Sequence, residues 1–211
     1  MTTLKRKIEI EAIFLIGIAV IVGIFFAVYG NNYKQQFNAS LKTPRVPVVK
    51  TILAKVTVSS QISPDGIKKV VMKITQNPDN TNAYSFSVVD VGSSIETQIF
   101  TWILDSSKNM LTPFNTWSPD DQYFFVEQNT GGPKSVFVFK VNGSPFANGS
   151  NYLDVTDLFT KANTGNNFDE ATGWASGTLI IINTINTDGT KGPSYWFEVP
   201  SQSVIQLSTE F

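Results

Sequence analysis

Carboxylates are the most chemically versatile side chains of this chain, because its 211 residues include no histidine and no cysteine. Ser-His-Asp and Cys-His catalysis, imidazole or thiolate zinc sites, haem and iron–sulfur ligation and disulfides are therefore excluded. Asp120 and Asp121 form the most enzyme-like pair, since adjacent carboxylates could bind a cation or act as acid and base. We interpret both as turn residues and predict no catalytic residue and no enzyme; a carboxylate-dependent hydrolase is the alternative.

Two oxygen-rich segments resemble calcium-binding loops only in part. A helix–loop–helix calcium loop requires an acid at its first position and a glutamate at its twelfth. In the segment that begins TINTDG, Thr184 and Tyr195 occupy these positions, so we expect a hairpin turn there. The segment 77–82 has a single carboxylate, Asp79, and is interpreted as a loop. We predict no metal ion and no cofactor, and calcium-dependent glycan binding is kept as an alternative.

Aromatic side chains are the other candidates for a binding role, because the chain contains 16 Phe, 6 Tyr and 4 Trp. Most of them should lie in the core, since strand alternation buries every second side chain of a half-buried strand. Tyr195 and Trp196 are the candidate binding surface. On an exposed rim, these two rings would form a platform for a peptide or a carbohydrate.

Residues 12–30 (AIFLIGIAVIVGIFFAVYG) predict a transmembrane helix. Nineteen uncharged residues at about 1.5 Å each span about 30 Å, the thickness of a hydrocarbon core. Residues 1–11 would form a short basic cytoplasmic tail, and residues 31–47 a polar stalk. We expect residues 12–30 to remain in the lipid bilayer of the plasma membrane as a single-pass anchor, with the C-terminal domain outside the cytoplasm. A cleaved signal peptide is the alternative, and an exported domain without disulfides favours a bacterial source.

Residues 48–211 form the body of the protein, which the pattern predicts to be all-β. Short runs of β-branched and aromatic residues alternate with turns rich in Pro, Asp, Asn and Gly. A helical period is nearly absent, although residues 154–162 could hold one or two helical turns. The expected strands are 48–58, 68–75, 83–91, 95–104, 122–128, 135–141, 178–185, 194–199 and 203–208.

Charge is divided unevenly along the chain. Residues 34–73 contain eight basic residues and one acid, whereas residues 74–211 contain five basic residues and fourteen acids. The basic stretch either attracts anionic lipid headgroups or protects strand edges from pairing with other molecules, and we favour the second interpretation. Because the body is acidic, we expect no nucleic acid partner.

A short turn motif recurs three times in front of a strand. The copies are ISPDG before KKVVMKI, WSPDD before QYFFVEQ and GWASG before TLIIINT. Proline fixes φ, and Asp-Gly or Asp-Asp completes the turn before the strand enters the core. A second strand follows each copy, which predicts repeats near 62–104, 117–159 and 174–208. The turn residues are Ser63, Pro64, Asp65 and Gly66 in the first copy, Trp117, Ser118, Pro119, Asp120 and Asp121 in the second, and Trp174 in the third.

The pattern W-S-P-D-x-x-Y-x-F-F followed by a hairpin resembles the TolB-like β-propeller repeat, also called the WD40-like or PD40 repeat. The match is close at 117–141, fair at 62–91 and degenerate at 174–208, where Pro and Asp are missing from the turn. Closed propellers have four to eight blades. About three repeats therefore imply an incomplete or open propeller of antiparallel blades, or one completed in an oligomer; a β-sandwich is the alternative fold.

The resemblance implies a scaffold that binds proteins or glycans more often than it catalyses a reaction. We therefore expect a membrane-anchored, extracytoplasmic, propeller-like binding module that mediates protein–protein interaction in the cell envelope. Its partner would be another protein or further copies of the same chain. The alternative is a structural or accessory subunit of a larger membrane complex.

Overall fold

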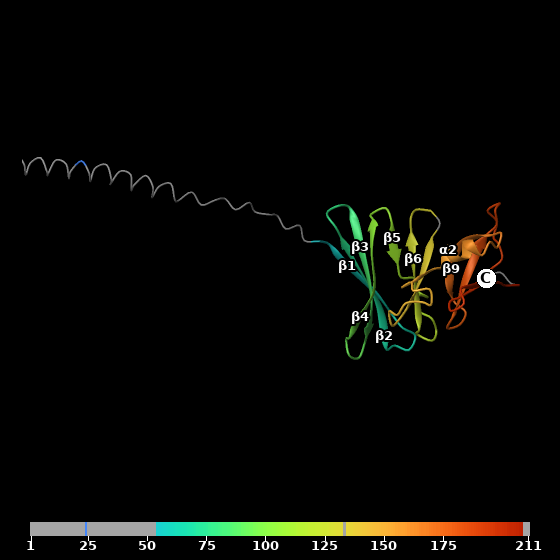
Figure 1. Ribbon diagram of the computed structural model, residues 1–211, viewed down its shortest axis with the longest axis horizontal. Helices are drawn as coiled ribbons and strands as arrows, with labels where there is room; N and C mark the ends of the chain where they lie inside the picture. The colour runs from blue at the N-terminus through green and yellow to red at the C-terminus, as the bar shows by residue number, and fades with distance from the viewer. Residues whose placement is uncertain (1–23, 25–53, 133, 209–211) are drawn as a thin grey trace, which may run out of the picture. The chain divides into compact units, whose positions relative to one another are not determined.

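Three antiparallel sheets of four strands each make up the part of the chain that the computed structural model describes, namely residue 24, residues 54–132 and residues 134–208 (Figure 1). Sheet I contains β1 (Val56–Ile62), β2 (Lys68–Gln76), β3 (Thr81–Asp90) and β4 (Glu96–Asp105). Sheet II contains β5 (Asn109–Leu111), β6 (Tyr123–Asn129), β7 (Ser135–Lys140) and β8 (Leu153–Asp154). Sheet III contains β9 (Asn167–Trp174), β10 (Leu179–Ile185), β11 (Tyr195–Glu198) and β12 (Ser203–Gln206).

Each sheet is a simple meander, in which every strand pairs with the strand that precedes it in the chain. The turns explain this local order. Gly66 between β1 and β2 and Gly189 between β10 and β11 have φ values of 75° and 84°, a backbone conformation that glycine adopts without steric cost. Consecutive strands joined by such turns pair with each other before any distant strand can.

Sheet II lies between sheets I and III, because its two faces belong to different hydrophobic clusters. Phe124 of β6 packs in a cluster with Phe86 of sheet I. The next residue, Phe125, points to the opposite face and packs in a cluster with Ile180 of sheet III. In Figure 1 the labelled strands β5 and β6 accordingly lie between those of sheet I and β9 of sheet III. The body is therefore a stack of three sheets with two apolar interfaces.

A short helix, α2 (Val155–Lys161), covers part of the second interface. Its N-cap is Asp154, whose Oδ1 accepts a hydrogen bond from the Asp157 N–H at 2.9 Å. Val155 and Phe159 point into the cluster between sheets II and III, where they are 0% and 1% exposed. The helix therefore forms because a local cap starts it and an apolar face holds it in place.

The prediction of an all-β body with antiparallel strands is confirmed, and α2 occupies the segment in which helical turns were predicted. Of the predicted first strand, residues 48–53 lie outside the described residues, and β1 runs from Val56 to Ile62, four residues beyond the predicted end. Strands β5, β8 and β9 were not predicted. The first two are only three and two residues long. β9 lacks an apolar run, and packing of Phe168 and Ala171 against the core holds it in the sheet.

The predicted tail, transmembrane helix and stalk lie outside the described residues, except for residue 24. Among the residues that are described, no helix has both the length and the apolar character needed to cross a bilayer.

Candidate binding groove at the repeat turns

The first two copies of the repeated motif form the same turn with the same hydrogen bonds. In sheet I, the Ser63 hydroxyl donates to Asp65 Oδ1 at 2.6 Å and accepts from the Lys68 N–H at 2.9 Å. In sheet II, the Ser118 hydroxyl donates to Asp120 Oδ1 at 2.7 Å and accepts from the Tyr123 N–H at 2.9 Å. Each turn directly precedes the second strand of its sheet. The repeat in the sequence therefore corresponds to a structural equivalence.

The third copy keeps the position of the turn without its serine–aspartate pair. The Ala175 N–H donates to the Leu179 carbonyl at 2.8 Å, as the Ser63 N–H does to the Lys68 carbonyl at 2.9 Å. A Cβ atom added at Gly177 would lie 2.5 Å from Asp120 Oδ2. Glycine at this position therefore lets the turn of sheet III approach the turn of sheet II closely.

The last turn residue differs between the first two copies, although its backbone conformation does not. Gly66 has a φ of 75° and Asp121 has a φ of 58°. Aspartate adopts this left-handed region more readily than most residues, since its short side chain can interact with the local backbone. Asp121 therefore preserves the turn at some conformational cost.

The carboxyls of Asp65 and Asp121 interact across the boundary between sheets I and II, and their pKa values move in opposite directions. Hydrogen bonds from the Ser63 hydroxyl and the Ile67 N–H lower the pKa of Asp65. Burial raises the pKa of Asp121, and the nearby charge of Asp65 raises it further. Among the described residues, Asp121 Oδ1 has no hydrogen-bond donor although it is buried. The ionised form of Asp121 is thus unfavourable in the folded protein.

Indole groups link neighbouring sheets at the same level. The Trp117 Nε1–H donates to the carbonyl of Gln61 in sheet I at 3.1 Å. The Trp174 Nε1–H donates to the carbonyl of Thr116 at 3.2 Å. Gln61 and Thr116 each lie two residues before the turn serine of their sheet, so the two indoles make equivalent contacts. The tryptophans of the motif therefore fix the spacing between successive sheets.

A groove with a volume of about 440 Å³ lies where these turns meet. All three sheets contribute to it, and none of the lining residues carries a charge. Phe114 is 89% exposed at this groove, whereas Trp117 is only 6% exposed. Asn115 connects sheets II and III through a hydrogen bond from its Nδ2 to the Thr172 carbonyl at 3.1 Å. The lining residues are Ile62, Pro64, Phe114, Asn115, Trp117, Pro119, Thr172, Gly173, Trp174 and Ile181.

Four of the predicted turn residues, Pro64, Trp117, Pro119 and Trp174, therefore line the groove, although they were assigned structural roles only. Phe114 and Asn115 were missed. They precede the second motif and have no counterpart in the other copies, so the repeat gave no signal for them. The sequence did contain one indication of Phe114: it is an aromatic residue within a polar segment typical of turns (TPFN), where an aromatic side chain is often exposed.

Tyr195 and Trp196, the predicted binding surface, lie on opposite faces of β11. Tyr195 is 2% exposed in the cluster between sheets II and III, and its hydroxyl accepts from Asn166 Nδ2 at 2.8 Å. Trp196 is half-buried on the other face, where it pairs with Ile181 and Ile205. The expected common platform is thus corrected, because alternation along a strand separates adjacent side chains.

The segments compared with calcium loops form turns that use their own oxygens. Asp188 Oδ1 accepts from the Thr190 hydroxyl at 2.6 Å, and Asp79 Oδ1 accepts from the Thr81 hydroxyl at 2.7 Å. The Thr184 hydroxyl donates to the Pro193 carbonyl at 2.6 Å. Within the described part of the chain, no group of three or more acidic side chains is arranged to hold a metal ion.

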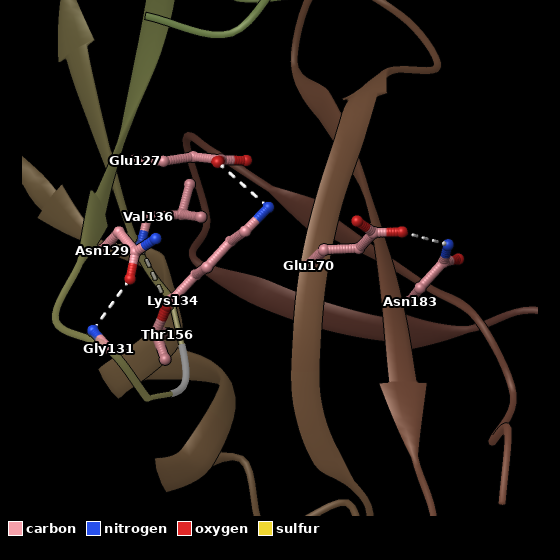
Figure 2. Close-up of polar contacts among 8 residues, drawn as sticks. All are labelled: Glu127, Asn129, Gly131, Lys134, Val136, Thr156, Glu170 and Asn183. Carbon is pink, nitrogen blue, oxygen red and sulfur yellow. Dashed lines mark hydrogen bonds and ion pairs between the residues drawn. The ribbon is translucent and has the colours of Figure 1, made fainter. Parts of the chain in front are cut away.

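A buried glutamate of β6 forms an ion pair with a partly exposed lysine near the turn formed by Gly131 (Figure 2). Glu127 Oε2 is 3.3 Å from Lys134 Nζ, and the glutamate side chain is only 8% exposed. Gly131 donates its N–H to Asn129 Oδ1 at 2.9 Å, and this hydrogen bond closes a side-chain turn after β6. Lys134 therefore neutralises a carboxylate buried between sheets II and III.

No protein-family model and no curated protein matches this chain. Thirteen chains of solved structures are similar to it. One is a TolB candidate from Agrobacterium tumefaciens, with 12% sequence identity and a TM-score of 0.33. The matched region covers 70% of this chain and 63% of the other, so this chain spans less than two thirds of that protein's length.

Proposed function

We propose that this protein is a protein-binding module, and that its groove at the repeat turns holds an extended apolar segment of a partner protein. The observation that supports this function is the groove itself, which combines side chains from three sheets with an exposed phenylalanine. Proline and aromatic side chains present flat apolar surfaces that suit an extended peptide. The lining contains Pro64, Pro119, Trp117 and Trp174.

The proposed activity is binding without catalysis. Asp65 and Asp120 each use Oδ1 to hold their own turn through Ser63 and Ser118, and neither residue lines the groove. Asp121 has a raised pKa but faces Asp65 at the sheet boundary and does not line the groove. A general acid or base must lie within hydrogen-bond reach of the reacting group.

We also propose that the three sheets are propeller-like blades and that residues 12–30 anchor them outside the cytoplasm. Equivalent turns, sequential meanders and face-to-face sheet packing support the first part. The uncharged run of nineteen residues supports the second. Protease added to intact cells should cleave the body, and complete protection of the body would contradict the proposed orientation.

Site-specific photo-crosslinking in native membranes tests the groove. A photoreactive phenylalanine analogue replaces Phe114 in the full chain, and Thr130, an exposed residue at the opposite end of sheet II, carries the same analogue as a control. We expect a discrete protein adduct from position 114 that is at least about tenfold more abundant than any from position 130. Equal labelling at both positions, or none at position 114, would contradict the proposal.

A further inference from the structure

Five of the six sheet edges in the described part of the chain carry a feature that discourages pairing with another molecule. Short strands, charged side chains, prolines and bulges are the usual features of this kind. The edge strands β5, β8 and β12 have only three, two and four residues. The edge strand β4 begins with Glu96 and ends with Asp105. The edge strand β9 contains Asp169 and Glu170, and its pairing with β10 has two register shifts.

The sixth edge, formed by β1, has none of these features. Its seven residues, VTVSSQI, include neither a charge nor a proline, and six of them are exposed. They pair with β2 without a register shift, from Val56 opposite Thr75 to Ile62 opposite Lys69. Lys69 does not protect this edge, because β2 has a strand on each side. A long, regular and uncharged edge is suited to accept a further strand.

The main-chain groups that face this edge belong to alternate residues of β1. At one end of the strand, the Gln76 N–H donates to the Lys55 carbonyl at 3.0 Å. At the other end, the Ser63 N–H donates to the Lys68 carbonyl at 2.9 Å. Bonded residues alternate along an antiparallel strand, so the odd-numbered residues bond to β2 and the even-numbered ones face outward. The outward-facing residues are Val56, Val58, Ser60 and Ile62.

The sequence of β1 is complementary to itself when a second β1 runs antiparallel along its whole length. This full overlap places Val56 opposite Ile62 and Val58 opposite Ser60 of the second copy. The outward-facing residues of the two strands then meet one another, as main-chain hydrogen bonding requires. Val56 and Ile62, which are 49% and 64% exposed, form apolar cross-strand pairs at both ends. Ser59 meets Ser59 of the second copy on the two-fold axis.

Charges beside β1 favour the same register. Lys55 and Asp65 are the only charged residues in the described segment 54–66, and both are exposed. Full overlap brings Lys55 opposite Ser63 of the second copy, two residues before its Asp65. Opposite charges therefore approach each other at both ends of the paired strands, and no like charges are opposed.

We propose that two copies of this chain pair through β1, so that their two sheets I form one continuous sheet of eight strands. The interface uses the same strand in both copies, so the assembly closes as a two-fold dimer. The four outward-facing residues of each copy form about eight main-chain hydrogen bonds with the other copy. The Ile62 side chain stays on the sheet face, where it lines the groove. Pairing through β1 and binding in the groove can therefore fail separately.

Proline at position 60 tests this edge in the full chain, by sedimentation velocity in detergent micelles over a range of concentrations. The unaltered chain should form dimers. Ser60→Pro removes an outward-facing N–H and places a ring on the free edge, so it should raise the dimer dissociation constant at least about tenfold. Ser60→Ala keeps the N–H and is the matched control, which should change the constant by less than about threefold. Neither variant removes a hydrogen bond to β2, and circular dichroism should confirm the fold of both.

Cysteine at the two-fold axis tests the register, because the chain contains no native cysteine. Opposed residues that do not exchange main-chain hydrogen bonds have Cα atoms about 4.5 Å apart, a distance that a disulfide can bridge. Ser59→Cys should therefore give a disulfide-linked dimer on oxidation. Thr57 is also exposed and lies on the same face of β1. Its counterpart in the second copy is four residues away along the strand, about 13 Å, so Thr57→Cys should not give the linked dimer.

Three results would overturn the proposal. The first is an unaltered chain that stays monomeric at all concentrations, including one whose β1 pairs with a different protein. The second is a dimer that Ser60→Pro weakens no more than Ser60→Ala does. The third is a dimer in which cysteine at position 59 forms no disulfide, or forms it no more readily than cysteine at position 57.

Discussion

The middle sheet and the two outer sheets have strands of similar composition but different surroundings. In β6 the five residues from Phe124 to Gln128 are all buried, whereas in β10 only alternate residues are. Both strands have apolar residues on both faces, so composition alone does not say which sheet lies in the middle. Within the described residues, tertiary packing covers both sides of sheet II and one side of each outer sheet.

We expect the largest loss of stability when a buried side chain of the middle sheet is truncated. Phe125→Ala removes a fully buried ring between sheets II and III, where Phe125 is 0% exposed. We expect a loss of about 3–5 kcal/mol in the free energy of unfolding. Ile103→Ala on the outer face of sheet I, where the side chain is 65% exposed, should cost below about 1 kcal/mol. Guanidinium titration followed by circular dichroism measures both; equal losses would contradict the packing order.

The ion pair between Glu127 and Lys134 gives the next effect, because it compensates a carboxylate buried on a strand of the middle sheet. Lys134→Met leaves the Glu127 carboxylate, 8% exposed, without its ion-pair partner. We expect a loss of about 1–3 kcal/mol, which a buried unsatisfied group typically costs. Adding Glu127→Gln should recover part of this loss. A loss that the second substitution does not reduce would show that packing, and not charge, explains the role of Lys134.

The indole contacts between sheets should have a smaller effect. Trp174→Phe removes the hydrogen bond to the Thr116 carbonyl, which holds sheet III at its distance from sheet II. We expect a loss of about 1–2 kcal/mol from the lost bond and the reduced ring area. Amide hydrogen exchange should increase at the turn 175–178 and remain unchanged in sheet I. Uniform exchange across all three sheets would contradict a local role.

The smallest effect concerns the turn at the boundary of sheets I and II, and it depends on pH. Because the folded protein raises the pKa of Asp121 above its ordinary value of 3.8, ionised Asp121 destabilises the fold at neutral pH. Asp121→Asn should therefore stabilise the protein at pH 7, by less than about 1 kcal/mol for this partly exposed group. The gain should shrink as the pH falls through the raised pKa, where the original carboxyl protonates. Thermal melts at pH 7 and pH 4 measure the difference, and a larger gain at pH 4 would contradict the assignment.

Local chemistry explains which parts of the fold could be predicted. The Ser-x-Asp pairs of the turns bond within five residues, so ISPDG and WSPDD predict the same turn wherever they occur. The runs between turns predict strands because their β-branched and aromatic residues suit a packed sheet. By contrast β9, with few apolar residues, forms only because Phe168 and Ala171 reach a core built by other segments.

The candidate site depended almost entirely on tertiary structure. The sequence by itself determined the β class, the three repeats and the tryptophans that begin two of the turns, because these features rest on contacts between near neighbours in the chain. Only the packed structure decided that Tyr195 is buried, that Phe114 is exposed and that sheet II is the one with described sheets on both of its faces. The physical reason is that burial depends on which sheet packs against which face, and residues more than fifty positions apart, such as Gln61 and Trp117, settle that question.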